Sequence, residues 1–386
     1  MNLESIYRTS KEQRLEHRYI TNKHIEPILN DLESIFEIDV LGRSVMDKSI
    51  YSIKVGSGKT KILMWSQMHG NESTTTKALF DMLNWLKSDA ADTRQVKNNF
   101  TFYILPILNP DGAALYTREN ANKVDLNRDA VNLSQPESKL LRQAFDEFQP
   151  DFCYNMHDQR TIFGLETVNG VKPATLSFLA PAYNDDRTIN SCRQTAINLI
   201  VAMNKSLQRY IPNQVGRFDD SFNINCVGDS FQALGVPTIL FEAGHYKDDY
   251  ERERTREFVF FALLSGFNAI NENVLVVNKN DEYFNIPQNK AIFYDIVYRN
   301  VNINYENKEK RAIFASQYKE VLFEDFVVFD AFIKEINNSE LIQGHIEYDC
   351  EGQFFVGKNG LKFPKTDTEA TFVIEPNRKF VNGVEV

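Results

Sequence analysis

His69 and Glu72 are the two residues whose types and spacing most directly suggest chemistry. They lie three positions apart in the segment 67–72, which follows the apolar run 61–65 and precedes a helix-like stretch from 73 to 79. The pattern predicts a buried strand, a tight Gly-Asn turn and a helix. On such a turn both side chains face one point beyond the strand, and a histidine nitrogen with a carboxylate oxygen is a usual ligand pair for zinc. Alone, the pair would most often be a surface contact, so the prediction depends on what the rest of the chain supplies.

Four further polar segments follow predicted strands or the turns after them. They are the turn 109–112 (Asn-Pro-Asp-Gly) with Arg118 shortly after it, the segment 125–128 (Asp-Leu-Asn-Arg), His157 after the strand 152–156, and Glu242 after the strand 236–241. The first three have ordinary structural explanations as a turn, a salt-bridged surface loop and a core histidine. Glu242 is harder to explain in that way, because a carboxylate directly after an apolar strand is carried toward the interior, where an uncompensated charge is costly.

The elements that must position these residues alternate along the chain. Period-two or continuous apolar runs predict strands at 36–42, 49–56, 61–66, 100–106, 152–156 and 236–241, and helical spacing predicts helices at 23–34, 75–87, 136–148, 189–209 and 250–270. Strands alternating with helices of this length indicate an α/β fold with a mixed or largely parallel central sheet flanked by helices. Sites in such sheets gather beyond the carboxyl ends of the strands, where His157 and Glu242 fall.

A change in composition divides the chain near residue 275. From 276 to 386 the sequence is rich in aromatic residues and asparagine, and it alternates at 291–298 and 321–329. We therefore expect a catalytic domain over 1–275 and a small β-rich C-terminal domain, of unknown role, over 276–386.

Charge and composition narrow the class of protein. The 43 basic and 53 acidic residues give a net charge of -10, which argues against a nucleic-acid-binding surface. The beginning of the sequence lacks a signal-peptide pattern and no apolar run has membrane-spanning length, so we expect a protein without a membrane partner, located in the cytoplasm. The four cysteines have no C-x-x-C spacing, so neither a thiolate zinc site nor a disulfide framework is expected.

Together and in this order, the polar segments resemble the zinc carboxypeptidases. That metallopeptidase family is marked by His-x-x-Glu, Asn-Pro-Asp-Gly, a downstream Arg, Asp-x-Asn-Arg, a strand-end His and a final strand-end Glu, and the resemblance covers about residues 23–270. It implies a mixed eight-stranded sheet flanked by helices. It also implies one Zn²⁺ held by His69, Glu72 and His157, with water in the fourth position as in catalytic zinc sites. Asp125 would accept a hydrogen bond from the far nitrogen of His69 and fix its tautomer.

The resemblance further implies roles around that ion. Glu242 would act as general base and then as proton donor to the leaving amine, and Arg118 would polarise the scissile carbonyl. Asn127 and Arg128 would hold the free α-carboxylate of a peptide or acyl-amino-acid substrate, because the planar fork of arginine matches a carboxylate.

Two departures from the family pattern concern the substrate. His157 is followed by Asp-Gln-Arg where digestive members have Ser-Tyr, and the loop 216–223 has no tyrosine. We take Tyr246 as the candidate replacement for a substrate-binding tyrosine. Asp229 is interpreted either as a pocket acid that favours a basic side chain or an amino group, or as a cap for the helix that follows it.

The sequence leaves three functions open, and it sets no oligomeric state. The first is a zinc metallocarboxypeptidase that removes a C-terminal residue. The second is a zinc amidase or deacylase acting on N-acyl amino acids or cell-wall peptides. The third is a silent binding module that uses the C-terminal domain for partners. The Asn-Pro-Asp-Gly turn favours the first over the second, and the full set of ligand and base residues argues against the third.

Overall fold

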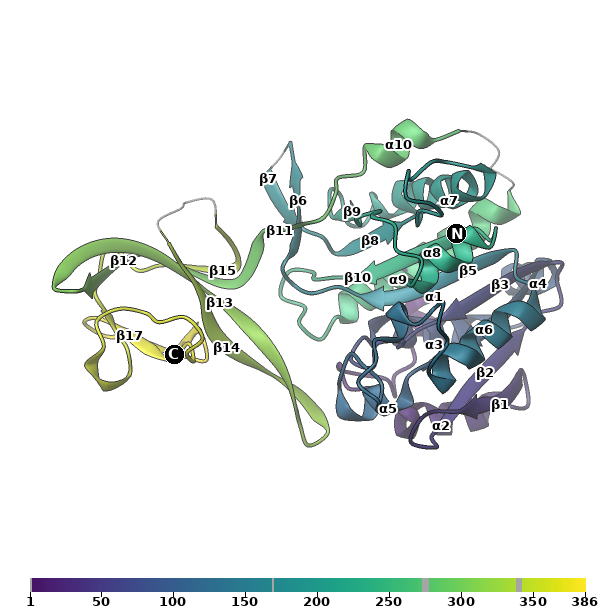
Figure 1. Ribbon diagram of the computed structural model, residues 1–386, viewed down its shortest axis with the longest axis horizontal. Coiled ribbons are helices and arrows are strands. Elements are labelled where there is room, and N and C mark those ends of the chain that lie inside the picture. The colour runs from purple at the N-terminus through teal and green to yellow at the C-terminus, as the bar shows by residue number, and fades with distance from the viewer. Residues whose placement is uncertain (1, 169, 273–277, 338–341) are drawn as a thin grey trace. The chain divides into compact units, whose positions relative to one another are not determined.

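The computed structural model describes residues 2–168, 170–272, 278–337 and 342–386 (Figure 1). The chain divides into two compact units. Unit 1 comprises Met1–Gln159 with Leu165–Asn289, and unit 2 comprises Arg160–Gly164 with Lys290–Val386. The domain boundary predicted at 275/276 falls within residues 273–277, outside the described residues.

Unit 1 contains all the α-helices of the described residues and the larger sheet. Its elements are α1 (Leu3–Ser10), α2 (Asn22–Leu32), β1 (Glu37–Arg43), β2 (Ser49–Val55), β3 (Thr60–Trp65), α3 (Thr74–Leu86), α4 (Ala91–Asn99), β4 (Phe100–Leu105), α5 (Pro110–Leu115), the 3-10 turn η1 (Leu126–Arg128), α6 (Pro136–Phe148), β5 (Phe152–Asp158), β7 (Gly170–Pro173), β8 (Leu176–Leu179), α7 (Ser191–Leu207), β9 (Val215–Arg217), α8 (Val227–Ala233), β10 (Thr238–Ala243), α9 (Glu253–Asn271) and α10 (Asn280–Phe284). The strand β6 (Phe163–Thr167) begins in unit 2 and continues into unit 1 from Leu165.

The main sheet has eight strands in the order β1-β2-β4-β3-β5-β10-β8-β9. The four central strands β4, β3, β5 and β10 are parallel, whereas β2 pairs antiparallel with both β1 and β4. At the other edge β8 pairs antiparallel with β10 and parallel with β9. The predicted α/β fold with a mixed eight-stranded sheet is therefore confirmed. Because the central strands are parallel, their carboxyl ends share one edge of the sheet, where polar side chains from distant segments can meet.

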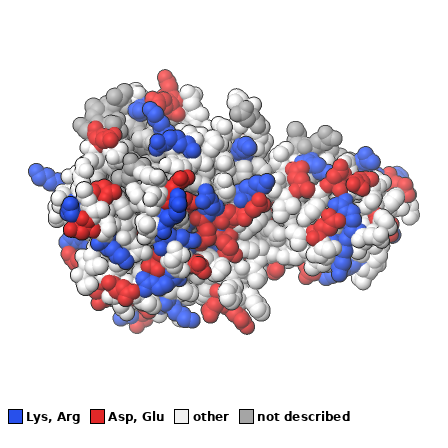
Figure 2. All heavy atoms as spheres, turned by 180° about the vertical axis from the view of Figure 1, so that it is seen from behind, with Lys and Arg blue, Asp and Glu red and all other residues white. Residues whose placement is uncertain are grey.

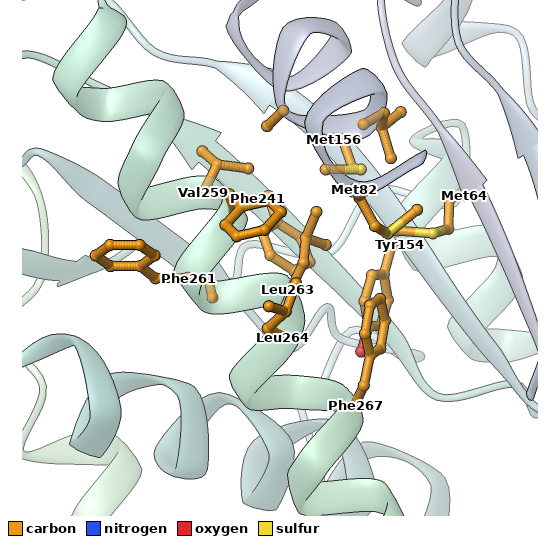
Figure 3. Close-up of a cluster of buried hydrophobic side chains, with 14 of the residues drawn as sticks. Met64, Met82, Tyr154, Met156, Phe241, Val259, Phe261, Leu263, Leu264 and Phe267 are labelled. Atoms are coloured by element: carbon orange, nitrogen blue, oxygen red, sulfur yellow. The ribbon is translucent and has the colours of Figure 1, made fainter. Parts of the chain in front are cut away.

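The alternation of side chains along each strand divides the core in two. On β3, Ile62 and Met64 belong to one core, which packs against α1, α2, α3, α7 and α9. Leu63 and Trp65 belong to the other, which packs against α6 and α8. Figure 3 shows part of the first core, where the ring of Tyr154 on β5 lies 5.1 Å from that of Phe241 on β10. Strands buried on both faces explain why these segments are continuous apolar runs in the sequence.

The strands that lead to the polar edge run further than the sequence suggested. His157 and Glu242, expected just after their strands, lie inside β5 and β10, because parallel pairing continues with Glu242 opposite His157 and Ala243 opposite Asp158. The Asn-Pro-Asp-Gly segment is also more than a turn. Asn109 caps α5 by accepting a hydrogen bond from the Gly112 N–H at 2.8 Å, and Pro110 is the first helical residue.

Unit 2 is built from β-strands around an aromatic core. Its elements are β11 (Lys290–Ala291), β12 (Phe293–Tyr305), β13 (Lys308–Phe323), β14 (Phe326–Asn337), β15 (Gln343–Asp349), β16 (Phe355–Val356), the 3-10 turn η3 (Lys358–Gly360), β17 (Phe372–Ile374), β18 (Arg378–Val381) and β19 (Val384–Glu385). The strands β12 to β19 form four-stranded sheets in the orders β14-β13-β12-β15 and β16-β17-β18-β19, and β11 pairs antiparallel with Phe163 and Gly164 at the start of β6. Tyr298, Phe314 and Phe372 lie in the core that both sheets share, with the rings of Tyr298 and Phe314 4.5 Å apart.

The charges on the surface and the polarity of the helices concern the predictions about nucleic-acid and membrane partners. Figure 2 shows Lys and Arg side chains interspersed with Asp and Glu over the face in view. Among the described residues, every helix is too short or too polar to span a bilayer.

Candidate metal centre and active site

Three buried side chains converge at the carboxyl edge of the main sheet. The two oxygens of Glu72 each lie 2.9 Å from an imidazole nitrogen, Oε1 from Nδ1 of His69 and Oε2 from Nδ1 of His157. The two Nδ1 atoms are 3.0 Å apart. His69 and His157 are each 2% exposed and Glu72 8%. Two nitrogens and a carboxylate thus face one small, water-poor space.

The turn that presents His69 and Glu72 is set by close backbone packing. Gln67 has a left-handed φ of 43°, and its buried amide donates to the carbonyl oxygens of Ile20 and Gly70, both at 2.9 Å. A Cβ added to Gly70 would lie 2.0 Å from the carbonyl carbon of Gly112 on α5. Glycine is therefore required at this position of the segment 67–72, because any side chain would force the turn and α5 apart.

Asp125 fixes which ring nitrogen of His69 carries the proton. Its Oδ1 lies 3.0 Å from Nε2 of His69, and its Oδ2 lies 3.1 Å from Nε of Arg118. Burial opposes the charged form of Asp125, but the bonds and charges of His69 and Arg118 outweigh it and hold its pKa well below the usual range. Since an ionised carboxylate only accepts, the ring proton of neutral His69 lies on Nε2 and the lone pair of Nδ1 faces Glu72.

This set of atoms fits a zinc ion. Without a cation, the carboxylate of Glu72 and two imidazole nitrogens would compete for protons in a buried space, which is an unfavourable arrangement. Their ligand atoms all lie within 4.8 Å of one another, a spacing at which one metal ion can bind all three. Two histidines with one glutamate, leaving a fourth position open, are the ligands of several catalytic zinc sites.

Glu242 lies beside this cluster. Its place opposite His157 in the parallel pair β5–β10 brings its side chain to the same edge. Burial, followed by the nearby charges of Glu72 and Asp158, raises the pKa of Glu242 well above its usual range. A carboxyl group with a raised pKa is suited to hold a proton and to pass it on.

Of the three predicted substrate-contacting residues, Arg118 contacts the cluster, whereas Asn127 and Arg128 lie on η1, which follows Asp125. Nη1 of Arg118 is 3.4 Å from Oε1 of Glu72. Asn127 accepts from the N–H of Val227 at 2.9 Å, so its side chain ties η1 to the start of α8. Nη1 of the exposed Arg128 donates to the carbonyl of Asn127 at 2.7 Å and lies 3.1 Å from Sγ of Cys226.

The two remaining predicted residues differ in their surroundings. Asp229 lies inside α8, whose N-cap is Cys226, so the interpretation of Asp229 as a helix cap is wrong. It is 7% exposed, and burial raises its pKa to about 7. The ring of Tyr246 lies 5.5 Å from that of Phe258 on α9. Within the described part of the chain, no contact joins Tyr246 to His69, Glu72 or His157.

Two residues to which the sequence analysis gave no role in the site lie next to it, and one of them, Asp158, contacts Glu72. The N–H of Asp158 donates to Oε2 of Glu72 at 3.1 Å, and Arg252 lies 3.5 Å from the carboxylate of Asp158. The position of Asp158 next to His157 was a visible signal in the sequence. No pattern in the sequence links Asp158 or His157 with Arg252, which lies far along the chain.

Comparison with known proteins agrees with this geometry. Residues 21–166 match the family model for zinc carboxypeptidases. Carboxypeptidase SOL1 of Arabidopsis thaliana is 29% identical over 151 residues, which are 33% of this chain and 30% of that protein. Carboxypeptidase 2 of Trichophyton tonsurans is 26% identical over 105 residues, 27% of this chain and 20% of that protein. The predicted resemblance to this family is confirmed, and the match spans less than a third of the length of these relatives.

Solved structures show the same fold. A metallo-carboxypeptidase from Burkholderia cenocepacia aligns with a TM-score of 0.53 and 15% identity, covering 66% of this chain and 70% of that one. Carboxypeptidase A from Helicoverpa armigera aligns with a TM-score of 0.51 and 16% identity, covering 72% and 80%. At this identity the likeness concerns the arrangement of the sheet and helices.

The raised pKa of Asp229 predicts a pH-dependent stability. Because the folded state holds this proton more tightly than the unfolded chain, the contribution of the neutral carboxyl is complete below about pH 4 and is lost as the pH rises through about 7. Asp229→Asn should therefore be more stable than the wild type at pH 8, on the order of a few kcal/mol, and nearly equal to it at pH 4. Urea unfolding followed by helical circular dichroism measures the difference.

The control is Asp219→Asn. Hydrogen bonds from Ser221 lower the pKa of Asp219, so this variant should be less stable than the wild type at pH 8 and at pH 4, and the deficit should shrink only as the pH falls below about 4. A gain in Asp229→Asn that is equal at both pH values would contradict the burial of a carboxyl with a raised pKa.

Proposed function

We propose that this protein, whose residues 21–166 match the zinc carboxypeptidase family, is a zinc metallocarboxypeptidase that hydrolyses the C-terminal peptide bond of peptides. The observation that carries the proposal is the convergence of the Glu72 carboxylate with Nδ1 of His69 and of His157, next to Glu242. These ligand atoms would hold one ion. A zinc ion bound there would supply Lewis acidity, which polarises a carbonyl and lowers the pKa of water.

Glu242 would do the proton transfer. It would take the proton from the water that attacks the scissile carbonyl and deliver the same proton to the leaving amine. Burial, together with the neighbouring carboxylates, raises its pKa and so favours the protonated form that the second step needs. Arg118, which already lies against Glu72 and Asp125, would place its guanidinium beside the developing oxyanion.

Arg128 and Asn127 would anchor the substrate. Arg128 is exposed, and its contact with the Asn127 carbonyl uses only one of its two terminal nitrogens. The second terminal nitrogen, together with Nε, can form a paired hydrogen bond to an α-carboxylate, to which Asn127 would add its amide N–H. Asp229, buried close to Cys226, would accept an amino group of the substrate, which favours a basic side chain or a diamino acid. Tyr246, packed against α9, has no role in this proposal.

The second candidate function is a deacylase or amidase acting on N-acyl amino acids or cell-wall peptides. It is favoured by the segment after His157, whose side chains turn inward. Asp158 accepts from Thr74, and the amide of Gln159 donates to the carbonyl of Ala174 at 2.7 Å. Neither side chain is therefore available to hold the backbone of a long peptide.

A substrate panel separates these functions. Zinc-loaded protein is assayed against peptides with free C-termini, the same peptides amidated, and N-acetyl amino acids. We expect release of the C-terminal residue from free peptides only, and a loss of about tenfold or more in kcat/KM for Arg128→Lys, because lysine cannot form a paired hydrogen bond to a carboxylate. Arg142→Lys on α6, whose partner is Asp146, is the matched control and should keep full activity. Equal cleavage of amidated peptides would refute the anchoring role, and cleavage of N-acetyl amino acids alone would support the second function.

Replacing the proposed base tests the chemistry separately from metal binding. Glu242→Gln should retain one zinc per chain and lose turnover by about 10²–10⁴-fold, because the amide cannot accept the proton. Metal content by atomic absorption and initial rates measure the two effects. Glu257→Gln, at another carboxyl whose pKa is raised by burial, is the control and should keep its rate. Loss of zinc from Glu242→Gln, or activity retained in it, contradicts the assignment.

A further inference from the structure

A buried guanidinium lies directly behind the candidate active site. Arg252 is 2% exposed and stands just before α9. Its Nη1 donates to the carbonyl of Ala243 and its Nη2 to the carbonyl of Gln159, both at 2.6 Å. Ala243 follows Glu242 on β10, and Gln159 is two residues past His157 on β5. One side chain thus bonds the ends of the two strands that carry the proposed base and a proposed ligand.

The partner of Arg252 extends this connection to the third segment. Nη1 of Arg252 lies 3.5 Å from Oδ2 of Asp158, and both side chains are 2% exposed. The same oxygen accepts from the N–H of Thr74 at 3.1 Å and from its hydroxyl at 2.6 Å. Thr74 is the first residue of α3, and the N-cap residue Ser73 makes no side-chain capping bond. Asp158 therefore caps α3 from another part of the chain, where a carboxylate is favoured by the helix dipole.

Asp158 also touches a proposed ligand itself. Its N–H donates to Oε2 of Glu72 at 3.1 Å, the oxygen that faces Nδ1 of His157. Glu72 lies two residues before α3, so the cap on Thr74 and the bond to Glu72 fix the same short segment from both sides. Asp158 thus contacts Arg252, Thr74 and Glu72, and it links the buried guanidinium to the cluster.

Arg252 has a backbone conformation that needs such support. Its φ of 57° and ψ of 31° are left-handed, a conformation that is unfavourable for a non-glycine residue unless its contacts compensate. Loss of the guanidinium would remove the ion pair of the buried carboxylate of Asp158, which is unfavourable. The pair is therefore an integral part of the edge of the sheet.

We propose that Arg252 and Asp158 are positioning residues that set the separation of Glu72, His157 and Glu242 and so determine zinc affinity. This inference rests on the proposed function, because it takes the cluster to be the zinc site. Neither residue touches substrate or reacting atoms in this account. They act through the backbone of β5, β10 and the start of α3.

The test measures zinc affinity of the full chain by competition with a chromophoric chelator, well below the unfolding temperature. Arg252→Lys keeps the charge but cannot bond two carbonyls and a carboxylate at once, and it should weaken zinc binding about tenfold or more. Thr74→Val removes one hydrogen bond without changing shape, and it should weaken zinc binding a few-fold. If Arg252→Lys does not fold, Thr74→Val decides the question alone.

Arg256→Lys is the matched control. Arg256 lies one turn further along α9, is fully buried, and bonds Asp81 and the carbonyl of Leu15. Its replacement should lower the unfolding temperature and leave zinc affinity unchanged, which separates positioning from general stability.

A second readout is the visible absorption of the cobalt(II)-substituted protein. It should shift in Arg252→Lys and stay as wild type in Arg256→Lys. Wild-type zinc affinity and an unshifted cobalt spectrum in both Arg252→Lys and Thr74→Val would overturn the proposal. A wild-type chain that binds zinc but cleaves no substrate would refute the proposed function and leave this test valid, whereas a wild-type chain that does not bind zinc would overturn both.

Discussion

The constraint on which the rest of this structure depends is the placement of a carboxylate between two imidazoles in a space almost closed to water. Glu72 faces Nδ1 of His69 and of His157 at hydrogen-bond distance, and all three side chains are buried. Such a cluster is stable only if the surrounding bonds fix the protons and the geometry. Asp125 holds the proton of His69 on the far nitrogen, and a glycine at position 70 lets the turn pack against α5. A cation would then be bound by groups that are already in position.

The architecture around the cluster follows from parallel strand pairing. Because β3, β5 and β10 are parallel and adjacent, residues at their carboxyl ends meet although they are far apart in sequence. Arg252 bonds the carbonyls at two of these ends, and Asp158 joins them to α3. His157 and Glu242 therefore stand on strands, and His69 and Glu72 stand on the tightly packed turn between β3 and α3. The residues proposed to meet the substrate, Asn127 and Arg128, stand on a short 3-10 turn.

Much of the site could be predicted because strand-end residues carry a local signal. Apolar runs followed by His69, His157 and Glu242 indicate both the sheet and its polar edge. The precise ends of β5 and β10 could not be predicted, since they depend on pairing between strands rather than on local pattern. The same holds for the bond of Asn127 to α8 and for the pair Asp158–Arg252, whose partners are separated by long stretches of chain. For Asp229 the local pattern was misleading. The pattern suggested a helix cap, whereas tertiary packing buries the residue inside α8.

The most direct test of this account is a crystal structure of the zinc-loaded protein, with anomalous data at the zinc edge. We expect one ion in unit 1, about 2.0–2.2 Å from Nδ1 of His69, Nδ1 of His157 and an oxygen of Glu72, with the fourth position open to water. Asp125 should remain bonded to Nε2 of His69. An ion bound elsewhere, or coordination of either histidine through Nε2, would contradict the central claim that this buried carboxylate and its two imidazoles form the metal site.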